Sequence, residues 1–286
     1  MSLAGELMAR GPDAGLARVY SAALRLYWEL ARRGYRRYAA YPAATWAGLF
    51  TNIVFGFLRG SVLLTVFRQR SEIGGYDAAD ALTYTWLTQA LIMTIFIWGW
   101  RELALRIRSG DIAVDLSRPL DVQLSGLAFD LGRACYHALF RGLPPLLVGA
   151  VVFELTMPSR PLVWLAFLVS VALAVAVSYA FRFLSNVSAF WLVDYRGMLV
   201  LATIVATFFG GLVIPIALFP DWLAAIAHAT PFPAMAQTPI DIFVGTIRGP
   251  VVARALVTQI GWLLTLLILG RAVFAAGSRR LVVQGG

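Results

Sequence analysis

The sequence contains no lysine, so all 24 of its basic residues are arginine. A Walker A phosphate-binding loop places a lysine on the β- and γ-phosphates, and Schiff-base catalysis needs a lysine amine. Both kinds of chemistry are therefore excluded for this chain. The single cysteine, Cys135, excludes an intrachain disulfide. With only two histidines, His137 and His228, a metal site such as a zinc cluster is not expected.

Charge is scarce in general, since only 14% of the residues are charged and 60% are hydrophobic. The mean hydropathy is +0.76. A soluble domain of 286 residues could not bury that much apolar surface, whereas a bilayer accommodates it. An apolar run of about 20 residues is long enough to cross a hydrocarbon core of roughly 30 Å. The composition therefore predicts an all-α integral membrane protein that crosses the membrane several times.

Six apolar segments are predicted as membrane spans: 42–67, 79–100, 124–153, 161–191, 198–218 and 252–276. In residues 16–38, apolar side chains recur at helical spacing among arginines. This pattern predicts that residues 1–41 contain an amphipathic helix lying in the membrane interface, with a plain helical lead-in to the first span as the alternative. Segment 219–250 is apolar but broken by four prolines between 220 and 239, which predicts two short re-entrant helices shielded by protein.

The arginines are unevenly distributed between the segments that connect these spans. If the N-terminus lies inside, segments 1–41, 101–123 and 192–197 and the tail 277–286, taken with Arg271, hold fifteen arginines, and the outside segments hold five. Arginine collects on the cytoplasmic side of membrane proteins. The distribution therefore places both termini in the cytoplasm. Cytoplasmic segments and segments next to anionic lipid headgroups are rich in arginine, which accounts for the net charge of +9. No nucleic-acid partner is therefore expected.

Four polar residues of the third predicted span share one face of a helix. Asp130, Arg133, His137 and Arg141 are three or four positions apart and lie within an arc of about 80°. A charge at the bilayer centre costs roughly 2.5–3.5 kcal/mol, so this stripe is expected to face protein or water. Two interpretations stay open. The stripe lines a translocation pathway or subunit interface, or it is an Asp–Arg network that orients the helix.

Two further arginines in predicted spans, Arg59 and Arg182, raise the same question with weaker patterning. Pro144 and Pro145 in the third span lack backbone donors and predict a kink there. The sequence contains no acidic cluster, nucleophile elbow or metal motif. No catalytic residue is therefore predicted.

Several strings along the chain resemble those of type-2 ABC exporter permeases, in particular a bacterial subfamily of ABC-2 family transporter proteins. The most specific are SGDIAVDLSRPLDVQ at 109–123, LAFDLGRA at 127–134, RGLP at 141–144 and FWLVDYRG at 190–197. The order of elements agrees with this resemblance, which covers nearly the whole chain. It consists of an amphipathic N-terminal helix, six spans, a charged loop after the second span and a broken apolar segment before the sixth.

The resemblance implies a permease subunit of an exporter in a bacterial plasma (inner) membrane. A separate ATPase subunit would bind ATP and Mg²⁺, so no cofactor is expected on this chain. A second permease would complete the pathway, as a homodimer or, in preference, a heterodimer. Drugs and other organic cations, lipids and glycans are substrates proposed for such exporters, and the sequence does not choose among them. The alternative function is an ATP-independent channel or secondary transporter, and a membrane-embedded enzyme comes third.

In such exporters a short coupling helix between the second and third spans docks into the ATPase, which here corresponds to residues 101–123. Gly110 is predicted to stop a helix that extends the second span, and Pro119 to reset the chain before the third. Ile112 and Leu116 are expected to offer apolar contacts to the ATPase, and Asp111, Asp115 and Arg118 to set the register by charge. The alternative is an inert polar turn.

Overall fold

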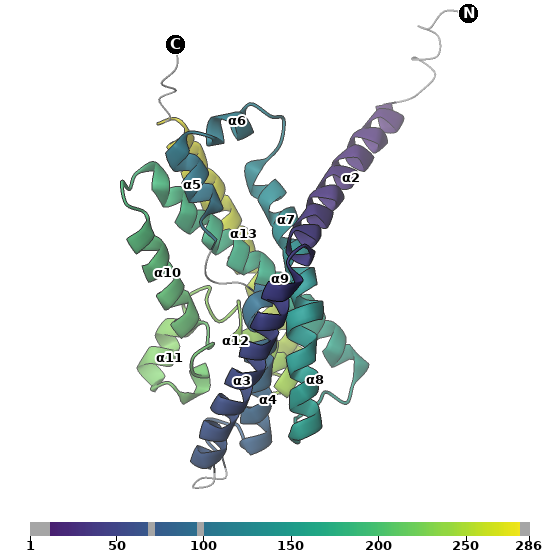
Figure 1. The fold of residues 1–286 in the computed structure, drawn as a ribbon, viewed down its shortest axis with the longest axis vertical. Coiled ribbons are helices and arrows are strands. Elements are labelled where there is room, and N and C mark those ends of the chain that lie inside the picture. The colour runs from purple at the N-terminus through teal and green to yellow at the C-terminus, as the bar shows by residue number, and fades with distance from the viewer. Residues whose placement is uncertain (1–11, 68–71, 96–99, 281–286) are drawn as a thin grey trace, which may run out of the picture.

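The computed structural model describes residues 12–67, 72–95 and 100–280 (Figure 1). Its longer helices are α2 (Pro12–Ala39), α3 (Pro42–Phe67), α4 (Ala78–Ile95), α7 (Val122–His137), α8 (Leu143–Val152), α9 (Pro161–Val187), α10 (Arg196–Phe209) and α13 (Pro250–Ser278). The shorter ones are α5 (Glu102–Ser109), α6 (Ile112–Leu116), α11 (Asp221–His228) and α12 (Gln237–Val244).

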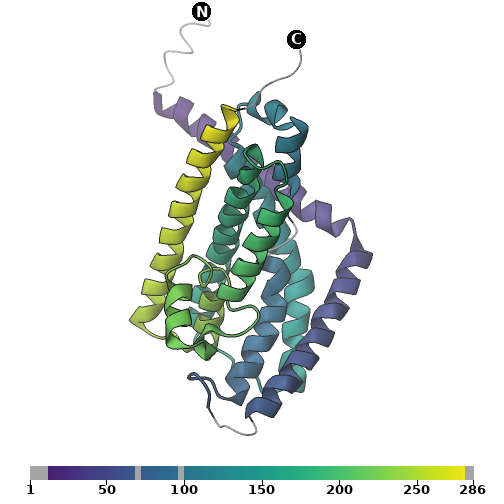
Figure 2. The same cartoon turned by 90° about the vertical axis from the view of Figure 1, so that its left-hand side faces the viewer.

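The longer helices run between two opposite ends of the molecule (Figures 1 and 2). One end carries α5, α6, the start of α2 and the end of α13. The other end carries α11, the end of α3 and the start of α4. Helices α3, α7–α8 and α10 lead toward the second end, and α4, α9 and α13 lead back. Below, the end with α5 and α6 is called the coupling end, and the other is called the far end.

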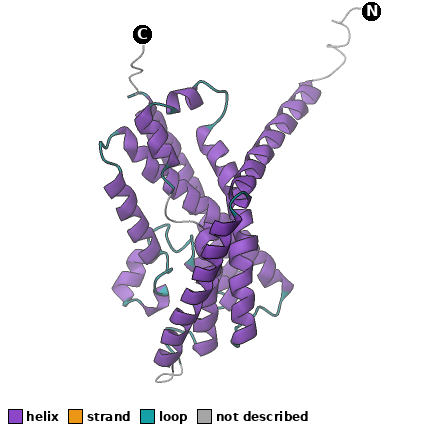
Figure 3. Ribbon diagram, in the orientation of Figure 1, coloured by secondary structure: helices purple, strands orange, loops and turns teal. Residues whose placement is uncertain are grey.

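The regular secondary structure of the described residues is helical, apart from one isolated bridge between Ile73 and Tyr76, and loops and turns join the helices (Figure 3). The predicted all-α fold is therefore confirmed. Four described stretches are long and apolar enough to cross a membrane: Pro42–Phe67, Val122–Val152, Pro161–Phe190 and Pro250–Ser278. They match the first, third, fourth and sixth predicted spans.

The other two predicted spans differ from the helices that the structure contains. Helix α4 ends at Ile95, and residues 96–99 of the second predicted span lie outside the described residues. Its hydropathy is lowered by Thr83, Thr88 and Gln89, which are buried inside the subunit. Helix α10 ends at Phe209, so the predicted extension of the fifth span to residue 218 is wrong.

Helix α10 ends because Gly211 adopts a left-handed backbone conformation, with φ of +80°. The irregular chain that follows has its carbonyl groups paired inside the protein. The Tyr84 hydroxyl donates to the Gly211 carbonyl at 2.6 Å, and the Arg59 guanidinium donates to the Leu212 carbonyl at 3.0 Å. Non-helical backbone at membrane depth needs such shielding. Residues 216–218 then form a short 3₁₀ turn.

The third span is interrupted by a π-helical turn, Ala138–Gly142, between α7 and α8. Pro144 and Pro145 directly follow it and cannot donate to the carbonyls of Phe140 and Arg141. The Leu143 amide donates to the Ala138 carbonyl, the wider spacing typical of a π-helix. The predicted irregularity is confirmed, and it takes the form of a register change.

Helix α2 makes its most extensive contacts with α7. The two helices approach so closely that a Cβ atom on Gly34 would overlap the Phe129 carbonyl, and one on Gly132 would overlap the Ala31 carbonyl. Glycine at both positions therefore permits the crossing. Packing against α7, rather than membrane contact alone, holds the C-terminal half of α2 in place.

The predicted pair of short helices before the last span is confirmed as α11 and α12. Helix α12 is almost wholly buried, with Ile240 and Ile242 fully covered. Phe243 of α12 lies edge-on to Trp164 and Phe167 of α9. This packing fills the core at the far end and fixes α12 against the long helices.

Candidate functional site

Residues 101–123 fold into two short helices, α5 and α6, that meet at an angle at the coupling end (Figure 1). Gly110 ends α5 in the left-handed conformation, with φ of +83°, and its amide donates to the Ile107 carbonyl. The prediction that Gly110 stops a helix is therefore confirmed. Because side chains rarely adopt this conformation, glycine sets the turn between the two helices.

Ile112 anchors α6 to the body of the subunit. Its side chain is 0% exposed and lies in a core cluster with Leu103 and Ile107 of α5 and Tyr179 of α9. The prediction that Ile112 contacts a partner is therefore wrong in this arrangement, because the subunit's own core covers it. Its burial makes α6 a fixed part of the fold rather than a solvated turn.

The outer surface of α6 is apolar. Val114 is 52% exposed and Leu116 is 42% exposed. Leu116 is thus placed where a partner could reach it, as the prediction requires. The helical turn of α6 separates Ile112 from Val114, so that Ile112 is buried and Val114 is exposed.

The charged residues of this segment are partly used inside the chain. Asp115 accepts from Arg106 of α5 at 2.6 Å, and Asp111 accepts from the Ser109 hydroxyl at 2.7 Å. The side chain of Arg118 has no hydrogen-bond or ion-pair partner within the described residues. Reversing the charge of Asp115 would therefore break a bridge between α5 and α6 as well as any contact with a partner.

The start of the third span is set by Asp121 rather than by Pro119. The Asp121 carboxylate accepts from the Leu124 amide at 2.8 Å, an N-cap that satisfies a free donor of the first turn. Arg271 of α13 pairs with the same carboxylate. Pro119 lies in the turn between α6 and this cap, and the helix itself begins at Val122.

Three of the predicted charges form a buried network between α7 and α9. Asp130 accepts from Arg133 at 2.7 Å and from Arg182 at 2.7 Å. Arg133 is 1% exposed and also donates to the carbonyls of Met93 and Thr94, the last turn of α4. The network therefore ties the end of α4 to α7 and α9. Such a network fits the orienting interpretation of these three residues.

The other half of the stripe is built differently. Neither ring nitrogen of His137 has a hydrogen-bond partner in the described part of the chain, although the ring is buried against Tyr38, with centroids 4.8 Å apart. Arg141 lies on the π-helical turn, and a Cβ on Gly48 would overlap its guanidinium. Its Nε atom is likewise buried without a partner among these residues. The shared face predicted by spacing thus divides into a paired half and an unpaired half.

Arg59 of α3 is distant from this stripe in the sequence and contacts a different part of the molecule. It lines a cavity of about 370 Å³ between α3, α4 and residues 212–218. The remaining walls are mostly apolar, with Phe55, Leu58 and Val62 from α3. The structure therefore does not bring Arg59 together with the other predicted site residues.

A polar cluster at the far end was not predicted. The Tyr76 hydroxyl donates to the Asp241 carboxylate at 2.6 Å, and the Gln237 amide donates to the same oxygen at 2.8 Å. The Gln237 carbonyl in turn accepts from Tyr84 at 2.6 Å. Gln237 and Asp241 are four positions apart within the proline-rich segment, which is the one signal in the sequence that marks them as neighbours on a helix.

No group of three or more His, Cys, Asp or Glu residues suited to a metal ion occurs in the described ranges. A family model described as "ABC-2 family transporter protein" matches residues 53–285. No curated protein and no solved structure matches the chain. The matched range begins within α3 and includes α5 and α6, the polar stripe and the far-end cluster.

Proposed function

We propose that this chain, which belongs to the ABC-2 family of transporter proteins, is the permease subunit of an ATP-driven exporter. A separate ATPase subunit binds ATP and Mg²⁺, and a second permease completes the pathway as a homodimer or, in preference, a heterodimer. The absence of lysine agrees with this division of labour, because the chain cannot supply the lysine of a Walker A site.

The observation that carries the proposal is the construction of α5 and α6. Ile112 and Ile107 fix the element to the core, and Val114 and Leu116 present an apolar surface outward. A rigid element joined to two long helices can transmit a push from a soluble partner into both. A flexible loop would be rich in Gly and Ser and could not do so.

The proposed topology has six spans, with the coupling end in the cytoplasm of a bacterial cell and the inner membrane as the location. The start of α2, the end of α13 and α5–α6 lie at the same end, which agrees with the arginine distribution (Figures 1 and 2). Helices α4 and α10 are the two spans that length and composition alone do not identify. Helix α4 lies among other helices that cover its polar side chains, whereas α10 lies at the edge of the molecule and packs mainly on α9 (Figure 1).

The proposal assigns different roles to the two halves of the polar stripe. Asp130, Arg133 and Arg182 hold the helices together from within. Arg141, whose buried Nε atom has no partner among the described residues, faces the pathway or the second permease, whereas His137 is buried within the subunit against Tyr38. Arg59 is proposed to face the pathway for a different reason: it donates to the Leu212 carbonyl and lines an open, mostly apolar cavity.

The test is whether an ATPase lacking membrane spans co-purifies with the tagged chain and whether Leu116→Arg abolishes that association. A charge on the apolar surface of α6 should lower ATPase recovery about tenfold or more, since losing one buried aliphatic contact and desolvating a charge exceeds 1.4 kcal/mol. Ile226→Arg is the matched control, because this residue of α11 is similarly exposed at the far end.

A second pair of variants separates coupling from local folding. Asp115→Arg alone breaks the bridge to Arg106, whereas the exchange Arg106→Asp with Asp115→Arg restores it with reversed polarity. Loss of ATPase binding in both would assign a partner contact to Asp115. Purification of an active transporter that contains no ATPase would instead support an ATP-independent channel or secondary transporter.

A further inference from the structure

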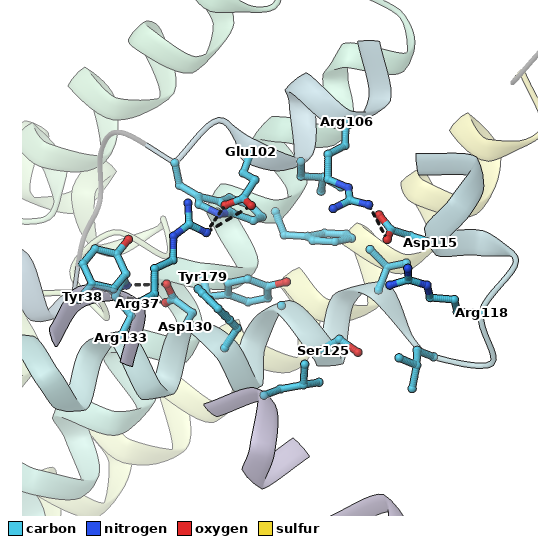
Figure 4. Close-up of a pocket in the computed structure, with 18 residues that line it drawn as sticks. Arg37, Tyr38, Glu102, Arg106, Asp115, Arg118, Ser125, Asp130, Arg133 and Tyr179 are labelled. Atoms are coloured by element: carbon cyan, nitrogen blue, oxygen red, sulfur yellow. Dashed lines mark hydrogen bonds and ion pairs between the residues drawn. The ribbon is translucent and has the colours of Figure 1, made fainter. Parts of the chain in front are cut away.

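A pocket of about 260 Å³ opens at the coupling end between α2, α5, the α6–α7 turn and α7 (Figure 4). This junction pocket has two kinds of wall. One wall carries guanidinium and carboxyl groups, among them Arg37, Arg106 and Arg118. The other is apolar and includes Leu30 of α2 and Phe129 of α7. A ligand that fills it must therefore have a polar part and an apolar part.

The charged wall contains guanidinium hydrogen-bond donors that have no partner among the described residues. Each of its three carboxylates already faces an arginine, with Glu102 paired to Arg37 at 3.0 Å and Asp115 to Arg106 at 2.6 Å, while Asp130 belongs to the buried network. Arg118 adds a guanidinium with no partner in the described ranges, and Figure 4 places it beside the Arg106–Asp115 pair. The Nε atom of Arg106 is also buried there without a partner. The pocket therefore fits an anion, and arginine suits a phosphate in particular.

The pocket lies beside a surface suited to hydrocarbon. On α2, six and two positions before Leu30, the side chains of Leu24 and Trp28 are exposed. Tryptophan and arginine on an amphipathic helix are typical of the membrane–water interface. In the junction pocket itself, an amphipathic ligand can place its apolar part against Leu30 and Phe129 and its phosphate against the arginines. A soluble anion would use only the charged wall.

We propose that the junction pocket binds the phosphate headgroup of an anionic phospholipid from the leaflet that faces the coupling end. Arg106 and Arg118 hold the phosphate, and Leu30 and Phe129 contact the first carbons of the lipid. Ligand pockets usually span roughly 300–1,000 Å³, so this one is sized for a headgroup and not for a whole lipid. The bound lipid would join α2, the coupling segment and α7. That this leaflet is cytoplasmic rests on the proposed function.

The experiment measures the melting temperature of the purified full chain in detergent while lipid is added. The probes are dioleoylphosphatidylglycerol, which is anionic, dioleoylphosphatidylcholine, which is zwitterionic, and inorganic phosphate. A ligand that binds only the native state stabilises it in proportion to its concentration relative to Kd. The anionic lipid should raise the melting temperature at lower concentrations than the other two probes.

Arg118→Gln is the informative variant, because Arg118 is exposed and has no partner in the described residues, so the fold does not depend on it. Loss of one charge-assisted hydrogen bond should weaken the apparent affinity for the anionic lipid about tenfold or more. Arg254→Gln, which removes an exposed arginine at the start of α13 near the far end, is the matched control and should leave the affinity unchanged.

Three results would overturn the proposal. Equal stabilisation by the two lipids would show that the headgroup charge is not recognised. Equal stabilisation by inorganic phosphate would identify a soluble anion as the ligand. Equal losses in the two arginine variants would show that lipid binds to surface charge in general. None of these measurements needs an ATPase, so failure here is distinguishable from failure of the proposed coupling.

Discussion

Two aspartates, Asp130 and Asp241, are held inside the subunit in opposite ways. Asp130 lies between two guanidinium groups, each 2.7 Å from one of its oxygens. Asp241 accepts from a tyrosine hydroxyl and an amide, and no arginine is paired with it among the described residues. One aspartate thus belongs to an ionic network and the other to a network of neutral donors.

The difference teaches what a carboxylate requires in each place. Among the described residues, Asp130 pairs with two buried arginines. The negative charge of its carboxylate therefore offsets part of the desolvation cost of burying the two guanidinium groups. At the far end, Asp241 is outside the predicted spans, and burial raises its pKa to about 6 although its hydrogen bonds oppose the shift. An ionised carboxylate stabilises the fold at Asp130, whereas ionisation of Asp241 destabilises it.

Removing the charge of Asp130 should have the largest effect. Asp130→Asn removes the carboxylate that pairs with two buried guanidinium groups, and breaking a buried pair in this way costs about 3–5 kcal/mol. The melting temperature of the purified protein measures the loss. Arg182→Met is the control, because it leaves the pair of Asp130 and Arg133 intact and should cost less. If the two variants melt alike, the carboxylate does not hold the network.

Arg141 tests whether the unpaired half of the stripe differs from the paired half. Arg141→Leu removes a charge that no carboxylate compensates in the described residues. We expect normal insertion, a melting temperature close to that of the wild type, and lower transport of a fluorescent or radiolabelled substrate once one is identified. Normal transport by Arg141→Leu would show that this half of the stripe only packs against α3.

The smallest effect is expected at Asp241, and it depends on pH. Because the folded pKa of about 6 exceeds the ordinary value of 3.8, the native state binds the proton more tightly than the unfolded state. The free energy of unfolding contributed by this group therefore falls as the pH rises from about 4 to 6. Asp241→Asn keeps the size of the side chain and should flatten that part of the melting-temperature profile. An unchanged profile would remove Asp241 as the titrating group.

Much of the fold was predictable because the signals were local. Apolar length identified the four long spans, four prolines identified the segment that holds α11 and α12, and Gly110 identified the end of α5. The sequence also predicted the disturbance at Pro144 and Pro145, since a missing donor acts on the helix that contains it. These features depend on residues close together in the chain.

The rest could not be predicted because it depends on contacts between distant segments. Spacing placed Asp130, Arg133, His137 and Arg141 on one face, but Arg182 of α9 reaches only the first part of that face. Ile112 and Leu116 are equally apolar in the sequence, and only the packing of α6 on α5 and α9 buries the first and exposes the second. The sequence of a short hydrophobic segment does not indicate which of its sides other parts of the protein will bury.

The most direct test of the account is the accessibility of the two ends of the molecule in intact cells. In a Cys135→Ser background, which removes the exposed native cysteine, single cysteines replace Asp111 and Asp221, and a membrane-impermeant maleimide is added from outside. Asp221 of α11 is chosen for the far end because the other aspartate there, Asp241, is hydrogen-bonded within the far-end cluster. The account predicts that the cysteine at 221 is labelled from outside. The cysteine at 111 should react only after permeabilisation and be protected by the co-purifying ATPase. Labelling of position 111 from outside would contradict it.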